Sequence, residues 1–152
     1  MGILYKVKRS SLIGVILIAL ISQFTAMYCN FALSTGFEKM NKFLVVFLAL
    51  VAAAVLLAIV YFIFQLILRK EEVEFKQVLM VNLAMTFALG GVLAVIVSLS
   101  TSAVPNTLAN VLIGVIQYGL LGWINWTSLE VSRQGKINIS IWTLILFVVS
   151  IF

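Results

Sequence analysis

Residues that could perform acid–base or metal chemistry are few in this sequence. It contains no histidine and a single cysteine, Cys29, and its five acidic residues are all glutamates. A zinc site, a Ser/His/Asp triad and a Cys/His nucleophile each need residue types that are missing or too few here. We therefore expect no catalytic residue, no cofactor and no metal, and a protein that is not an enzyme.

The charged side chains are concentrated in two short stretches, RKEEVEFKQ at residues 69–77 and LEVSRQGK at residues 129–136. If both stretches lie on one side of the molecule, ion pairs could join them, but exposed pairs contribute at most about 1 kcal/mol. Solvated caps on helix ends are the simpler interpretation, because acids suit the start of a helix and bases its end. The candidate loop contacts are Glu72, Lys76, Glu130, Arg133 and Lys136.

Uncharged amides, in contrast, fall inside the apolar part of the sequence. Gln23 and Gln117 each lie near the middle of an apolar run, where an amide facing lipid costs several kcal/mol unless it is hydrogen-bonded. We expect both to face the interior, where Asn30 and Asn110 complete a candidate polar cluster. The cluster would serve as a pocket for a small solute or headgroup, or only as interhelical hydrogen bonding worth about 0.6 kcal/mol per bond. A second candidate group, nearer one membrane face, consists of Gln65, Asn82 and Asn125.

Hydropathy places these residues on membrane-spanning helices. The 152 residues are 64% hydrophobic and 10% charged, whereas soluble domains carry about 25% charged residues. The mean hydropathy is +1.23. Five apolar runs approach the length of about 20 residues that a helix needs to cross a bilayer, so we predict one all-α membrane bundle over residues 1–152. The runs are residues 11–33, 43–68, 78–99, 108–127 and 137–152.

Small and polar residues recur at every fourth position of the third run and continue in the fourth. Such residues let membrane helices approach each other closely. The turn TSAVPNT between these runs is short and uncharged, so we expect the third and fourth helices to form an antiparallel hairpin. The predicted helix-packing stripe consists of Asn82, Thr86, Gly90, Ala94 and Gly114.

Basic residues are distributed unevenly between the two ends of such a bundle. Because short basic loops remain in the cytoplasm, we expect the N-terminus inside and the C-terminus outside. The net charge of +5 then reflects topology and an attraction to anionic lipids, and it does not call for nucleic acid. The inner end would carry Lys6, Lys8, Arg9, Arg69, Lys70, Lys76, Arg133 and Lys136, and the outer end only Lys39 and Lys42.

The two charged loops resemble those of the Yip1-domain membrane proteins and their bacterial relatives. The resemblance covers about residues 43–152, and it implies five helices with the N-terminus in the cytoplasm and a membrane scaffold instead of an enzyme. Eukaryotic members act in vesicle trafficking and contact small GTPases, but they have a long cytosolic segment where about ten residues precede the first apolar run here. We therefore expect no GTPase partner. The matching residues are Phe75, Lys76, Gln77, Glu130, Val131, Gly135 and Lys136.

Two functions fit this sequence best, and a lipid-modifying enzyme, an immunity protein and a holin are the remaining alternatives. The first is a non-enzymatic membrane scaffold, adaptor or accessory subunit that binds another membrane protein, or a second copy of itself, through small-residue helix faces. The alternative is a small transport component, a permease or channel subunit, with an uncharged polar cavity lined by glutamine and asparagine. No ionisable side chain lies at mid-depth in any run, which argues against proton relays and charge-coupled transport. The expected location is the bacterial cytoplasmic membrane, as a multi-pass protein in contact with lipids.

Overall fold

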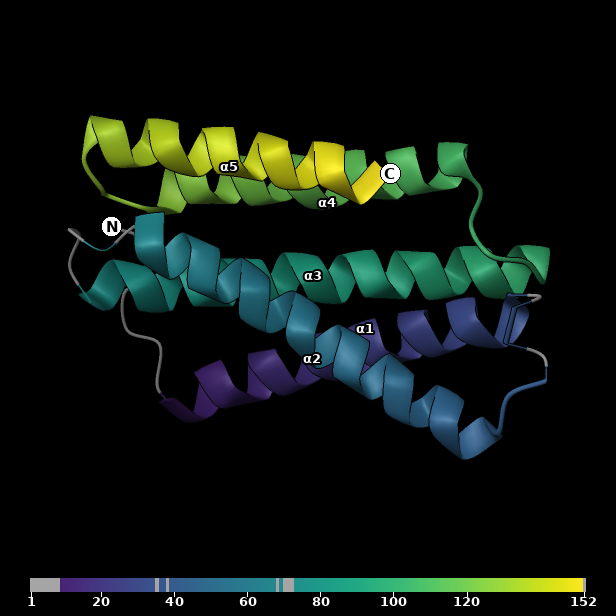
Figure 1. Ribbon diagram of the computed structural model, residues 1–152. Helices are drawn as coiled ribbons and strands as arrows, with labels where there is room; N and C mark the ends of the chain where they lie inside the picture. Colours follow the sequence, from purple (N-terminus) through teal and green to yellow (C-terminus); the bar gives the residue numbers. More distant parts are fainter. Residues whose placement is uncertain (1–8, 35, 38, 68, 70–72, 152) are drawn as a thin grey trace.

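The computed structural model describes residues 9–34, 36–37, 39–67, 69 and 73–151, and this part of the chain forms five α-helices (Figure 1). Each predicted apolar run lies on one of them. The helices are α1 Arg9–Leu33, α2 Lys42–Ile67, α3 Val73–Thr101, α4 Thr107–Ser128 and α5 Arg133–Ile151.

All five helices begin before the predicted apolar runs, and two of them do so by four residues or more. Helix α3 begins at Val73 instead of residue 78, and α5 begins at Arg133 instead of residue 137. The prediction counted only apolar residues, whereas polar and charged residues can continue a helix beyond the hydrocarbon region, since its backbone bonds are internal. The last residues of the second and fifth predicted runs, Leu68 and Phe152, lie outside the described residues.

Successive helices run in opposite directions, so that the chain crosses the bundle five times (Figure 1). Helices α4 and α5 lie side by side, α3 packs against α4, and α1 packs along α3. Helix α2 crosses obliquely in front of α1 and α3 in this view and packs mainly against α1. Two helix pairs that are not consecutive, α1 with α3 and α2 with α5, therefore join the hairpins into one bundle.

The closest approach of α1 and α3 depends on a glycine. A Cβ atom at Gly91 would lie 2.9 Å from the backbone carbon and oxygen of Ser22, so a larger residue would force the two helices apart. The Ser22 hydroxyl donates a hydrogen bond of 2.7 Å to the Ala88 carbonyl oxygen. Small residues thus bring α1 into van der Waals and hydrogen-bonding contact with the backbone of α3.

A short connection that ends in an N-cap residue joins α3 to α4. The Asn106 side chain accepts a hydrogen bond of 2.9 Å from the Ala109 backbone N–H, which satisfies one free donor at the start of α4. Pro105 precedes this cap. The connection spans residues 102–106 only, so α3 and α4 form an antiparallel hairpin, as the sequence predicts.

Four of the five helices, α1 to α4, are long and apolar enough to cross a membrane by length and composition. Their outer faces carry large exposed apolar side chains such as Phe43, Phe62 and Leu99. The buried apolar core is concentrated around Phe64, Phe87 and other residues of α2 to α5. So much exposed apolar surface fits a protein whose helices are embedded in lipid.

Candidate functional site

A polar cavity of about 280 Å³ lies between α1, α3 and α4, with Leu56 of α2 and Ser150 of α5 at its edge. Gly90, Gly91 and Ala94 form its α3 side. The four amides of the predicted interior cluster all line it, two from α1 and two from α4. These are Gln23, Asn30, Asn110 and Gln117.

Gln117 is the most unusual of the four amides. Its side chain is 7% exposed, and among the described residues it has no hydrogen-bond partner. It packs over Gly90, where an added Cβ would overlap the Gln117 side-chain oxygen Oε1. Glycine at position 90 is therefore what leaves room for this amide, and the buried amide keeps free donors and an acceptor at the cavity.

The other three amides are held in different ways. Gln23 is buried and its Nε2 donates to the Phe87 carbonyl oxygen at 2.5 Å, which ties α1 to α3. Asn30 has a buried Oδ1 without a hydrogen-bond partner in the described part of the chain. Asn110 is exposed, and its Nδ2 donates to the Pro105 carbonyl oxygen at 3.3 Å.

The cavity reaches the surface, because exposed Asn110 and Ser150 are among its lining residues. The rings of Phe87 and Tyr118 meet edge to face, with centroids 6.1 Å apart, and form its inner wall. Exposed Asn110 lies at the opposite end, where α4 begins. None of the lining residues is charged, so the free amide groups suit an uncharged solute that both donates and accepts hydrogen bonds.

The second predicted group is only partly brought together. Asn82 on α3 donates through Nδ2 to Asn125 Oδ1 at 2.8 Å and to Ser128 Oγ at 2.9 Å. Both asparagines are almost fully buried. Gln65 does not join them: its Nε2 donates to the Tyr61 hydroxyl at 2.7 Å, within α2.

The predicted helix-packing stripe lies inside the bundle. Asn82, Thr86 and Gly90 are buried and Ala94 is half-buried at the cavity wall. A Cβ at Gly114 would approach the Phe147 ring of α5 to 3.1 Å. These small residues therefore serve packing within the chain and do not form a free surface for a partner.

Among the predicted loop contacts, Lys136 has well-defined partners. Its Nζ donates to the Trp126 carbonyl oxygen at 3.1 Å and lies 5.6 Å from the centroid of the Trp126 ring. A basic group at the carbonyl end of α4 is favourable for the helix dipole. Lys76 is half-buried, whereas Glu130 and Arg133 are exposed. Glu72 lies outside the described residues.

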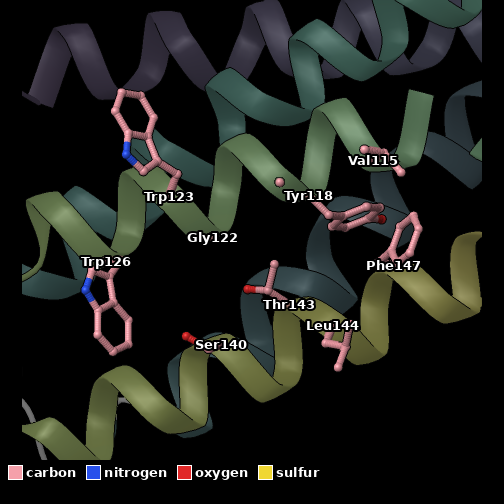
Figure 2. A pocket seen from close by; sticks show the side chains of 10 residues that line it. Val115, Tyr118, Gly122, Trp123, Trp126, Ser140, Thr143, Leu144 and Phe147 are labelled. Atoms are coloured by element: carbon pink, nitrogen blue, oxygen red, sulfur yellow. The ribbon is translucent and has the colours of Figure 1, made fainter. Parts of the chain in front are cut away.

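Sequence reasoning missed an apolar groove of about 490 Å³ between α4 and α5 (Figure 2). Gly119 and Gly122 are among its lining residues, together with the exposed Trp123 and Trp126. In Figure 2 the Trp126 ring points toward α5, whereas the Trp123 ring projects from the other side of α4. The available signal was the spacing of these glycines and tryptophans on one helix. The remaining lining residues are Val115, Tyr118, Ser140, Thr143, Leu144 and Phe147.

Comparison of the chain with protein-family models, curated proteins and solved structures finds no match in any of the three. The resemblance to Yip1-domain proteins therefore stays a prediction.

Proposed function

We propose that this chain is a small, non-enzymatic transport component that holds an uncharged polar solute in the cavity between α1, α3 and α4. The observation that carries the proposal is a pair of amides at this cavity: Asn30 keeps a buried Oδ1 without a hydrogen-bond partner among the described residues, and Gln117, which is 7% exposed, has no hydrogen bond to any of them. An unpaired buried amide costs about 1–3 kcal/mol, and a solute or water in the cavity would recover that cost. The cavity volume of about 280 Å³ matches roughly nine water molecules at about 30 Å³ each.

The proposed orientation places the open end of this cavity outside the cell. Arg69, Lys76, Arg133 and Lys136 lie at the end of the bundle where α2 and α4 end, and Lys39 and Lys42 lie at the other. Because basic residues are more numerous at the first end of the bundle, we expect that end to face the cytoplasm. This orientation requires α5 to cross the membrane as well, and at about 1.5 Å per residue its 19 residues come close to the hydrocarbon thickness of about 30 Å.

Solute flux into proteoliposomes tests the transport function. Vesicles containing the protein are exposed to a gradient of glycerol or urea, and the reswelling rate is followed by light scattering. We expect the protein to accelerate reswelling several-fold over empty vesicles, and the Gln23→Leu/Gln117→Leu double variant to lose the acceleration while staying folded.

Gln65→Leu is the matched control, because this glutamine does not line the cavity and donates its hydrogen bond to Tyr61. It should leave the reswelling rate unchanged. Equal rates for the protein-containing and empty vesicles, or for the double variant and the unmodified protein, would rule out the transport function.

A scaffold or adaptor is the second candidate, and the outer face of α2 favours it. Ala54 and Ala58 are exposed, four residues apart at the middle of a helix that packs mainly against α1. Small residues at this spacing let two membrane helices approach closely. We propose that the partner on this face is a second copy of the chain.

Cysteine cross-linking in the membrane tests this second candidate. In a Cys29→Ser background, Ala54→Cys should form a disulfide-linked dimer on mild oxidation. Met85→Cys is the control, because Met85 is exposed near the middle of α3 and lies away from the α2 face. Equal cross-linking at both positions, or none at position 54, would argue against self-association through α2.

A further inference from the structure

We propose that the groove between α4 and α5 binds one acyl chain of an anionic phospholipid from the cytoplasmic leaflet, with the headgroup phosphate at Lys136. The inference rests on the lining, length and mouth of the groove, and it is independent of any solute in the polar cavity.

The groove suits an apolar occupant because its two aliphatic hydroxyl groups are already engaged. Ser140 Oγ donates to the Lys136 carbonyl oxygen at 2.9 Å, and Thr143 Oγ1 donates to the Ile139 carbonyl oxygen at 2.8 Å. Both bonds are internal to α5. The other surfaces offered to an occupant are aromatic rings, aliphatic side chains and the bare backbone at Gly119 and Gly122 (Figure 2).

The length of the groove favours a lipid chain over a partner helix. Its lining on α4 runs from Val115 to Trp126, which corresponds to about 16 Å of helix rise at 1.5 Å per residue. The hydrocarbon core of a bilayer is about 30 Å thick. The groove therefore covers about one leaflet, which is the depth of a single acyl chain, whereas a spanning helix would need a contact surface through both leaflets.

The mouth of the groove carries the groups that a phospholipid headgroup needs. The rings of Trp123 and Trp126 are 66% and 52% exposed at the end of α4, a position typical of tryptophan at the membrane interface. The Lys136 ammonium lies over the Trp126 ring and uses one of its three N–H groups on the Trp126 carbonyl oxygen. The other two remain for a phosphate, and exposed Arg133 lies one turn earlier on α5.

Quenching of tryptophan fluorescence by brominated lipids tests this site. The chain has three tryptophans, and Trp142 does not line the groove, so a Trp142→Phe background leaves the two groove residues as reporters. The protein is reconstituted with brominated phosphatidylglycerol or with brominated phosphatidylcholine at equal mole fractions. We expect the anionic lipid to quench at least about twofold more efficiently, as a binding difference of about 0.4 kcal/mol would give.

Two variants separate the headgroup contact from the acyl-chain contact. Lys136→Gln should lower quenching by the anionic lipid to the level of the zwitterionic lipid. Gly122→Leu should lower quenching by both lipids, because a Cβ at Gly122 meets only the Thr143 methyl at 3.9 Å and the leucine can extend into the groove. Gly14→Leu is the matched control: a Cβ there has nothing within 4 Å, and the residue lies on α1.

The ratio of quenching by the two lipids is the deciding quantity, since any intrinsic change in Trp126 fluorescence in Lys136→Gln cancels in it. A ratio of one for the unmodified protein, or a ratio that Lys136→Gln leaves unchanged, would overturn the lipid site. Dimerisation that disappears in Gly122→Leu would also overturn it, because a second copy of the chain would then occupy the groove. Solute flux through the cavity would be unaffected by any of these results.

Discussion

The α3–α4 interface contains a buried side-chain amide of α4 at two positions, which we call its two polar levels. The two amides differ in the residue that they face on α3. At the level nearer the charged loops, Asn82 faces Asn125, and the two amides are joined by one hydrogen bond of 2.8 Å, while Asn82 Oδ1 and Asn125 Nδ2 have no partner among the described residues. About two turns further along each helix, Gly90 faces Gln117, and that amide has no partner among the residues described. Both levels are buried, so exposure does not explain the difference.

The residue that each amide faces on α3 explains this difference. An asparagine at position 82 fills the space between the helices and donates a hydrogen bond to Asn125 Oδ1, so that this level holds the two helices together. A glycine at position 90 supplies neither volume nor a polar group, and the space left over joins the cavity. An amide opposite an amide therefore stabilises the bundle, whereas an amide opposite a glycine creates a site.

The largest expected effect comes from breaking the paired level. Asn125→Leu removes the acceptor of Asn82, leaves the Asn82 amide bonded to Ser128 only, and puts a branched side chain at a site that is 2% exposed. We expect a loss of about 2 kcal/mol in the free energy of unfolding. Reversible unfolding in mixed micelles of mild detergent and sodium dodecyl sulfate measures it, and a loss below about 0.5 kcal/mol would show that the pair contributes little.

Adding a methyl group at position 90 should lower the free energy of unfolding by less than Asn125→Leu does. In Gly90→Ala the new methyl group occupies the position of the Gln117 oxygen Oε1, the far end of a flexible side chain that can rotate into the cavity. We expect a loss of about 1 kcal/mol. The same substitution in a Gln117→Ala background should cost at least about 0.5 kcal/mol less, because the clash is gone. Equal costs in the two backgrounds would contradict the contact between Gly90 and Gln117.

The smallest effect on stability is expected for Gln117→Leu. No hydrogen bond to a described residue is lost, the volume is similar, and an unpaired amide is removed from the interior. We expect the free energy of unfolding to change by less than about 0.5 kcal/mol or to rise. A loss close to that of Asn125→Leu would mean that Gln117 stabilises the bundle in the same way as the paired asparagines.

The sequence predicted the helices and the position of each polar residue along its helix, because apolar runs and helix rise fix both. Position along a helix did not fix rotation: Gln65 bonds Tyr61 on its own helix and does not join Asn82 and Asn125. The bond from Gln23 to the Phe87 carbonyl was not predictable either, because it requires α1 to pack along α3, which is not its neighbour in sequence. The groove was missed because its depth depends on how α4 and α5 separate at Gly119 and Gly122.

Accessibility to a membrane-impermeant thiol reagent tests most directly whether the two polar levels differ. Cys29 is the single cysteine, so a Cys29→Ser background leaves one thiol in each of the variants Gln117→Cys and Asn125→Cys. We predict that the reagent, added from outside, labels position 117 through the solvated cavity and leaves position 125 unlabelled. Equal labelling at the two positions, or labelling of position 117 only from the cytoplasmic side, would contradict a polar cavity open at the outer end.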